Sequence, residues 1–350
     1  MEKKIFGSIA DGTVISTYSF TNKNNVTMTV SDLGATLVRV AVPDRDGVPR
    51  DVVLGYDAPQ DYIDHTCYFG TVIGRSGNRI DKGRFTIGGK TYQLAVNDNE
   101  NNLHSGPNGY DERRWEVEEL DEEKNSIRFG LDSADGDQGF PGNLHIAVTY
   151  TLTEKNEVVL HYHGTADADT VVNMTNHSYF NLAGHDSGSM EDQLLAIYAD
   201  SFTEIRDHQA IPTGRLLPVE GTPMDFRTAK PIGRDIEADY EQMKFVGGYD
   251  HNFVLSDAAG EQKKMAWAFC EKTGIGLEAY TDCCGVQFYA GNFITDQKGK
   301  DGAVYGRRHG FCLESQYYPN AINQPEFPSP LLRAGDVYDT VTSYRFFVEK

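Results

Sequence analysis

The fold is decided by the stretch Leu144–Thr165, LHIAVTYTLTEKNEVVLHYHGT. Apolar and polar side chains alternate through Leu144–Thr153 and again through Glu157–Thr165, and the polar turn Glu154-Lys155-Asn156 separates the two runs. A period of two places successive side chains on opposite faces of a strand. Two such runs joined by a short polar turn predict an antiparallel hairpin with one face toward the core.

The same period extends outward along most of the chain. Further hairpins are expected at Arg84–Ile87 with Lys90–Leu94, Thr36–Val42 with Arg50–Leu54, and Trp115–Leu120 with Ser126–Leu131. Helical periodicity is weak, with short candidates near Ala58–His65 and Ile236–Lys244. Sequential hairpins without strand–helix–strand signals argue against a parallel sheet. The pattern predicts an all-β fold, a large antiparallel β-sandwich with few short helices.

Charge and composition exclude several classes of protein. The 350 residues carry 32 Lys and Arg against 52 Asp and Glu, a formal net charge of −20. We therefore expect no nucleic-acid partner, because binding a phosphate backbone requires a basic surface. The longest apolar runs, such as Leu194–Ala199, are too short to span a bilayer, so no membrane partner is expected. The acidic balance suits a neutral or weakly charged small-molecule ligand.

The first candidate for function is Val171–Leu182, VVNMTNHSYFNL. Read as one strand, it places a polar or amphipathic set on a single face: Asn173, Thr175, His177, Tyr179 and Asn181. Burying such a face is unfavourable unless each group is hydrogen-bonded. Two interpretations stay open, a solvated outer face and a sugar-binding floor. His177 adds weight to the second, because histidine is the commonest general acid or base.

The second candidate is Gly310–Asn320, GFCLESQYYPN, where Glu314 lies in a strand that carries little other charge. A partly desolvated carboxylate there would have a raised pKa, as a general base near neutral pH requires. An exposed strand glutamate is the alternative.

Four loop or turn segments carry further polar candidates. His104 ends the Asn- and Gly-rich stretch Asn97–Gly106, and the turn-rich stretch Gly74–Gly83 contains Arg75, Asn78 and Arg79. Asp250 follows the diglycine Gly247-Gly248, and Gln287 alternates with Phe288 in Gly285–Asn292. Arginines in such turns often only anchor a loop, and aspartate after glycine is usually a turn former.

Metal, nucleotide and disulfide chemistry find no support in the sequence. His161 and His163 could share a strand face, but no third ligand stands at a characteristic spacing. Phosphate-binding glycine motifs are missing. Five cysteines in no regular pattern argue against a disulfide framework and favour a reducing cytoplasm.

Taken together and in order, these segments resemble the aldose 1-epimerase (galactose mutarotase) family. The resemblance covers nearly the whole chain and rests on YFGTVIGRSGNRI (68–80), NNLHSG (101–106), GFPGNL (139–144), NMTNHSYFNLAG (173–184), PVEGTPMDFR (218–227), GYDHNFVL (248–255), GVQFYAGN (285–292) and CLESQYYPNAINQPEFPSPLLRAG (312–335). It implies that residues 1–350 form a single domain with the family's extended β-sandwich. It also implies no cofactor and a reaction that interconverts the α and β anomers of a free aldose.

Carried over by position, the resemblance implies that Glu314 is the general base and His177 the general acid. It implies a sugar-holding role for Asn78, Arg79, His104, Asp250 and Gln287, with Tyr179 as an additional binding candidate. Two alternatives remain, an epimerase for hexose 6-phosphates and a non-catalytic sugar-binding protein on the same fold. The sequence carries no signal for an oligomeric state.

Overall fold

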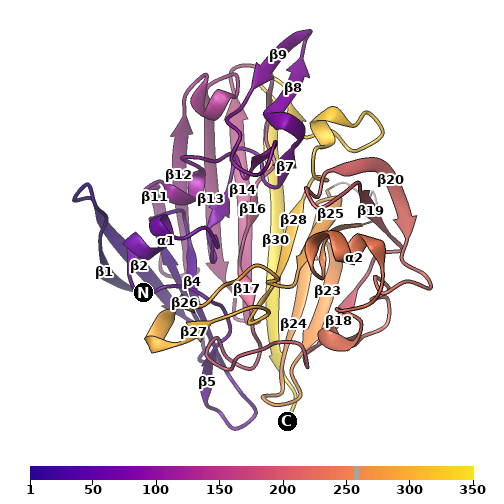
Figure 1. Ribbon diagram of the computed structural model, residues 1–350. Helices are drawn as coiled ribbons and strands as arrows, with labels where there is room; N and C mark the ends of the chain where they lie inside the picture. Colours follow the sequence, from indigo (N-terminus) through magenta and orange to yellow (C-terminus); the bar gives the residue numbers. More distant parts are fainter. Residues whose placement is uncertain (256–259) are drawn as a thin grey trace.

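A long antiparallel sheet runs through the molecule (Figure 1). The computed structural model describes residues 1–255 and 260–350. The sheet has nine strands, in the order β11 (Glu116–Asp121), β12 (Ser126–Ser133), β13 (Leu144–Leu152), β14 (Glu157–Ala166), β30 (Val337–Val348), β24 (Ile275–Thr281), β23 (Lys263–Phe269), β18 (Leu194–Ile197) and β21 (Lys230–Pro231).

The hairpin that decides the fold forms as predicted. β13 and β14 pair antiparallel from Leu144 opposite Ala166 to Leu152 opposite Val158. Along β14, Val158, Leu160 and Tyr162 are buried, and the residues between them are more exposed. The alternation seen in the sequence therefore places one face of the hairpin against the core.

Two further sheets complete the architecture. One has six strands, in the order β17 (Tyr179–Phe180), β28 (Phe311–Gln316), β25 (Gly285–Tyr289), β22 (Asp250–Val254), β19 (Ser201–Ile205) and β20 (Pro212–Pro218). The other has five, in the order β1 (Glu2–Ser8), β2 (Val14–Thr21), β3 (Thr27–Ser31), β4 (Leu37–Pro43) and β5 (Pro49–Asp51). One hydrophobic core joins all three sheets, with members such as Phe20, Tyr162 and Phe288.

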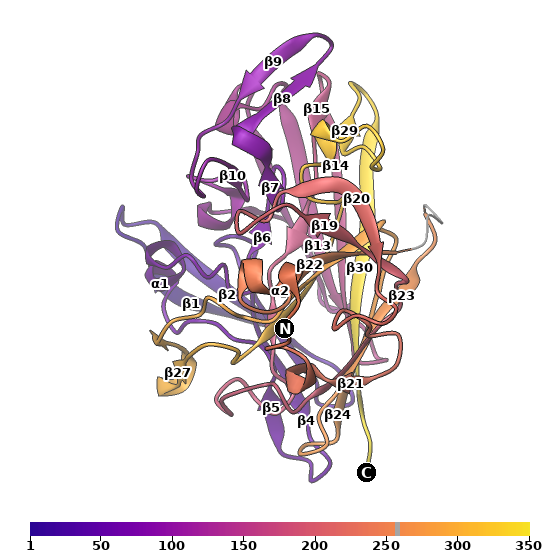
Figure 2. The same ribbon diagram turned by 45° about the vertical axis from the view of Figure 1, so that its right-hand side comes forward.

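Across residues 1–255 and 260–350, five short two-stranded pairs lie outside these three sheets. They are β6 (Val72–Ile73) with β16 (Thr175–Asn176), β7 (Arg79–Ile80) with β10 (Asn102–Leu103), β8 (Arg84–Ile87) with β9 (Lys90–Gln93), β15 (Thr170–Val171) with β29 (Leu331–Leu332), and β26 (Gln297–Lys298) with β27 (Val304–Tyr305). The β8–β9 hairpin projects at the top of the molecule in both ribbon views (Figures 1 and 2). All of the hairpins predicted from the sequence are confirmed.

The helices are short, as expected. α1 (Pro59–Asp64) lies within the predicted segment 58–65. α2 (Glu241–Val246) begins five residues later than the predicted segment 236–244. Among the described residues, no helix is long and apolar enough to cross a membrane.

The reading of Val171–Leu182 as one strand is wrong. The segment contains parts of three two-residue strands that pair with different partners, β15 with β29, β16 with β6 and β17 with β28. Asn176 interrupts the ladder, because its Oδ1 accepts hydrogen bonds from the backbone N–H and the hydroxyl of Ser178. Every residue of the segment is buried, so the alternative of a solvated outer face is also excluded.

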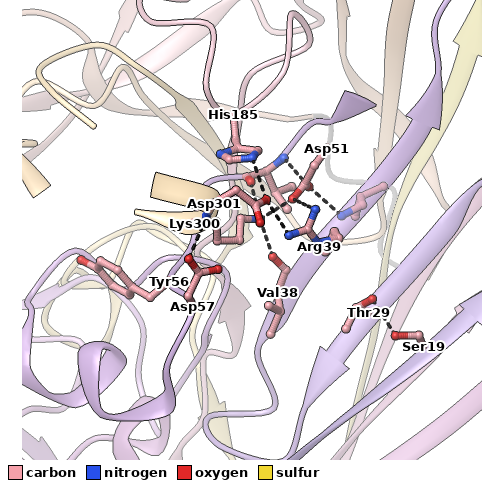
Figure 3. A network of polar contacts seen from close by, with 12 residues as sticks. Ser19, Thr29, Val38, Arg39, Asp51, Tyr56, Asp57, His185, Lys300 and Asp301 are labelled. Atoms are coloured by element: carbon pink, nitrogen blue, oxygen red, sulfur yellow. Dashed lines mark hydrogen bonds and ion pairs between the residues drawn. The ribbon is translucent and has the colours of Figure 1, made fainter. Parts of the chain in front are cut away.

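A buried lysine, Lys300, connects the segment before β28 to the five-stranded sheet through hydrogen bonds (Figure 3). Lys300 Nζ donates to the carbonyl oxygens of Val38 and Val53, at 2.6 and 2.8 Å, and to Asp51 Oδ2 at 2.6 Å. Burial lowers the pKa of Lys300, although Asp51 opposes that shift. These bonds fix the stretch β26–β27, from which the chain returns into β28 and Glu314.

Candidate active site

One pocket brings together all the residues to which the family resemblance gives a catalytic or binding role, while the other polar candidates Arg75, Asn173, Thr175 and Asn181 lie outside its lining. It has a volume of about 140 Å³ and is lined by Thr66, Tyr68, Asn78, Arg79, Leu103, His104, His177, Tyr179, Asp250, Gln287, Tyr289, Phe293 and Glu314. A larger adjoining pocket of about 560 Å³ shares six of these lining residues, Thr66, Tyr68, Arg79, Leu103, Asp250 and Phe293. The lining comes from segments far apart in the chain that meet at the six-stranded sheet.

Three neighbouring strands of that sheet supply the floor. Glu314 lies on β28 directly opposite Gln287 on β25, and Asp250 begins β22 opposite Tyr289. Gln287 Nε2 donates to Asp250 Oδ1 at 2.7 Å. The alternation of β28 aims Glu314 at the pocket, because side chains two apart share a face.

Amide side chains behind this floor hold it in place. Gln316 Nε2 donates to Gln287 Oε1 at 3.1 Å and to Asn252 Oδ1 at 3.0 Å. Gln316 Oε1 accepts from Asn78 Nδ2 at 3.3 Å. A continuous set of hydrogen bonds therefore runs from Asp250 to Asn78 and fixes which atoms face the pocket.

His177 and Glu314 are the central pair of titratable groups. His177 Nε2 lies 3.7 Å from Glu314 Oε2, and both side chains are almost fully buried. The imidazole is stacked between two phenol rings, with centroid distances of 5.0 Å to Tyr179 and 5.6 Å to Tyr68. These rings restrict the plane of the imidazole and leave Nε2 directed at the carboxylate.

The buried position shifts the pKa values of this pair in opposite directions. Burial raises the pKa of Glu314 well above its usual value, and the nearby Asp250 carboxyl adds to the rise. Burial lowers the pKa of His177 to about 4. A raised pKa makes the carboxylate of Glu314 a stronger base, and a lowered pKa keeps the imidazole of His177 neutral near pH 7, with a single N–H to offer. Perturbed pKa values at two adjacent groups are typical of acid–base catalysis.

His104 faces the same pair from a loop. Its ring centroid lies 5.4 Å from that of His177, and its Nδ1 accepts the backbone N–H of Asn78 at 3.1 Å. Burial, then the neighbouring His177 and Arg79, lower its pKa well below the ordinary range. His104 is therefore neutral near pH 7 and carries its proton on Nε2, which makes that nitrogen a hydrogen-bond donor.

Arg79 and Asp250 close the polar side of the pocket. Arg79 Nε donates to Asp98 Oδ2 at 2.7 Å. Burial raises the pKa of Asp250, and Arg79 and the Gln287 amide oppose that shift. Charge of both signs thus lies beside the pocket, with donors and acceptors available to a polyhydroxylated ligand.

The hydrogen bonding of His104 argues against a resident metal ion. Ligand atoms of His104, His177 and Glu314 lie within 4.8 Å of one another, close enough to suggest a divalent cation. A metal-binding imidazole presents a lone pair to the metal and donates its other N–H. At His104 the arrangement is reversed, because Nδ1 accepts from Asn78. This donor set fits a sugar hydroxyl better than a metal.

Sequence reasoning missed several lining residues, chiefly Tyr68 and Phe293. Tyr289 is indicated by its alternation with Phe288, which places it on the same face of β25 as Gln287. Tyr68 adopts a positive φ of 56°, as do Asn78 and His104 at 57° and 55°. Such backbone conformations depend on tertiary contacts and leave no local pattern in non-glycine residues.

A buried carboxylate beside a buried imidazole, in a pocket of hydrogen-bonding groups on a β-sandwich, defines an acid–base enzyme of carbohydrates. The family model of aldose 1-epimerase matches residues 16–345. A galactose mutarotase from Mus musculus is 42% identical over 347 residues, which cover 99% of this chain and 98% of that protein. An aldose 1-epimerase from Escherichia coli K12 is 40% identical and covers 97% of each chain.

Solved structures agree with the sequence relatives. The crystal structure of a GalM/aldose epimerase homologue from C. elegans superposes with a TM-score of 0.88 at 31% identity, covering 95% of this chain and 99% of that one. The chain belongs to the aldose 1-epimerase family, isomerases that interconvert the anomers of aldoses. The predicted β-sandwich and the predicted enzyme class are thereby confirmed.

Proposed function

We propose that the chain interconverts the α and β anomers of free aldohexoses such as galactose and glucose, with Glu314 as general base and His177 as general acid. The observation that carries the proposal is the 3.7 Å separation of His177 Nε2 and Glu314 Oε2 at the pocket. Opening a pyranose ring requires a proton to leave O1 and another to reach O5. Both oxygens are bonded to C1, so the base and the acid must lie side by side.

The reaction then follows from two proton transfers. Glu314 removes the proton from O1 while the Nε2 proton of His177 moves to O5, and the ring opens to an aldehyde. Rotation about C1–C2 presents the other face of C1, and reclosure reverses both transfers. Each general acid or base contributes on the order of 10²–10⁴-fold.

The remaining predicted residues would hold the sugar. Asp250 can accept from two hydroxyl groups, and the amides of Gln287 and Asn78 are fixed by the Gln316 hydrogen bonds. His104 offers an N–H donor, Arg79 a cationic one, and Tyr179 an aromatic wall against His177. The galactose mutarotases among the relatives support galactose as one substrate.

Two observations favour a free sugar over its 6-phosphate. Arg75 is fully buried and donates to the carbonyls of Pro141 and Gly142, so it cannot reach a substrate. Arg79 and Asp250 line both pockets, but Arg79 is already paired with Asp98 at 2.7 Å, so a phosphate would meet the carboxyl of Asp250 without a free cation beside it. The hexose 6-phosphate alternative is therefore the weaker one.

The test is polarimetry on freshly dissolved α-galactose and α-glucose, each run beside its 6-phosphate. The native protein should accelerate the decay of rotation of the free sugars with a kcat/KM well above that for the phosphates. The folded variants Glu314→Gln and His177→Asn should lose at least about 10²-fold in kcat. Near-normal turnover in either variant, or a clear preference for a phosphate, would contradict the proposal.

We also propose that residues 1–350 act as one domain in the cytoplasm. One hydrophobic core contains residues from Tyr18 to Phe346, which supports a single unit. The five cysteines, all within the described part of the chain, form no disulfide with one another, which is compatible with a reducing compartment.

A further inference from the structure

A buried thiol lies behind the imidazole of His177. Cys312 Sγ is 3.5 Å from His177 Nδ1, on the side of the ring away from Glu314. Cys312 is on β28, two residues before Glu314, and it pairs with Tyr179 on one side and Tyr289 on the other. Its exposed fraction is 0%, so the thiol is part of the wall that supports the site.

The proton on the thiol has consequences for the imidazole. Burial, together with the nearby Glu314 carboxyl, raises the pKa of Cys312 well above its usual value, so the sulfur keeps its hydrogen. A neutral imidazole donates from one ring nitrogen and accepts at the other. If the S–H donates to Nδ1, the imidazole proton sits on Nε2 and faces Glu314 Oε2. The opposite tautomer would direct a lone pair at the carboxylate.

The same arrangement recurs at His104 with a different donor. There the backbone N–H of Asn78 donates to Nδ1, which leaves Nε2–H for the pocket. In both imidazoles Nδ1 has a partner from the protein: the backbone amide of Asn78 at His104 and the thiol of Cys312 at His177. The partner of a histidine's second nitrogen decides which nitrogen acts in the reaction.

We propose that Cys312 is a positioning residue that sets the tautomer of His177 and so presents Nε2–H to the ring oxygen of the sugar. The inference rests on the proposed role of His177 as the acid. Cys312 does not touch the substrate and acts through the imidazole. Its removal should therefore reduce the rate of the chemical step and leave sugar binding nearly unchanged.

The experiment compares three single variants with the native protein. Cys312→Ala removes the donor and should lower kcat about tenfold, the equivalent of one buried hydrogen bond, with KM changed less than about twofold. Cys312→Ser restores an O–H donor and should recover most of kcat. Cys67→Ala is the matched control, because Cys67 is buried in the same aromatic cluster but its thiol contacts Tyr56. It should keep the native kcat.

A spectroscopic readout separates positioning from simple packing. Imidazole ¹⁵N spectra of histidine-labelled protein, with His177 assigned by its loss in His177→Asn, should show Nε2–H in the native and Cys312→Ser proteins. The Nδ1–H form should appear in Cys312→Ala. A native spectrum with Nδ1–H, or equal losses of kcat in the Cys312→Ala and Cys67→Ala variants, would overturn the proposal. Failure of the native protein to anomerise any sugar would instead overturn the proposed function and leave the tautomer result standing.

Discussion

Glu314, the proposed general base, is buried at a position where its ionised form is unfavourable for stability. Its exposed fraction is 3%, and burial raises its pKa well above the usual value. The folded state therefore binds the carboxyl proton more tightly than the unfolded chain does. This stabilisation is fully present below the unfolded pKa of about 4.3 and is lost as the pH rises through the folded value. At neutral pH the ionised side chain therefore lowers the free energy of unfolding.

The first prediction follows from this conflict. Glu314→Gln should abolish most of the activity and raise the free energy of unfolding at pH 7 by about 1–2 kcal/mol, the usual exchange of activity for stability at a catalytic site. The native protein should also lose stability from about pH 4.3 upward, and the variant should lose less. Urea titrations of both proteins across that range measure the difference.

Glu278→Gln provides the matched control on another strand. Burial opposes ionisation of Glu278, but Lys264 outweighs it and lowers the pKa of the carboxyl. Its replacement should keep the activity and give no gain in stability. If Glu314→Gln were no more stable than Glu278→Gln at pH 7, burial of the ionised Glu314 carboxylate would not lower the free energy of unfolding.

At the scale of elements, Arg75 fixes the segment that leads to Asn78 and Arg79. Its guanidinium donates to Pro141 O at 2.8 Å, Thr170 Oγ1 at 3.1 Å and Ser133 Oγ at 2.6 Å. A lysine has no planar fork and fewer donors, so it cannot replace these bonds. Arg75→Lys should lower the free energy of unfolding by about 2–4 kcal/mol.

Urea denaturation checks this prediction, with Arg84→Lys on the exposed position of β8 as its control. The control should shift the midpoint little, because exposed substitutions change stability by less than about 0.5 kcal/mol. Equal midpoints for the two variants would mean that the contacts of Arg75 add nothing to the fold.

Elements of this fold differ in how far the sequence determines them. The hairpin β13–β14 could be predicted because its alternation and its turn are local. Val171–Leu182 could not, since its residues pair in turn with β29, β6 and β28, all distant in the chain. Of the proposed site residues, His177 and Glu314 were indicated by their polar positions in predicted strands, and the sugar-holding roles of the others came from the family motifs. The stacking of Tyr68 and Tyr179 on His177 needed the three-dimensional arrangement, because no local pattern indicates which rings meet.

At the scale of the whole molecule, the net charge of −20 sets how ligands approach. A neutral sugar is not steered by this field, so kcat/KM for galactose should change little with ionic strength. A hexose 6-phosphate is repelled, and salt screens that repulsion beyond a Debye length of about 10 Å at 0.1 M. Competitive inhibition by galactose 6-phosphate should therefore strengthen between low and high salt.

Steady-state kinetics at several concentrations of potassium chloride measure both effects in one series. Each sugar serves as the control for the other, because they differ only in the phosphate. Inhibition that weakened steadily with added salt would instead indicate a local cationic site for the phosphate near the pocket, and the substrate class would need revision.

The position of β30 in the nine-stranded sheet bears on how the protein is made. β30 pairs with β14 along one edge and with β24 along the other, and in Figure 1 it runs between them. It is also the last of these strands to leave the ribosome. At a synthesis rate of roughly 5–20 residues per second, about 10–30 seconds pass between the synthesis of β14 and that of β30. During this interval one edge of β14 has no strand to pair with. Slower synthesis lengthens that interval, so the yield of native protein should depend on the rate of translation and on chaperones that cover the waiting edge.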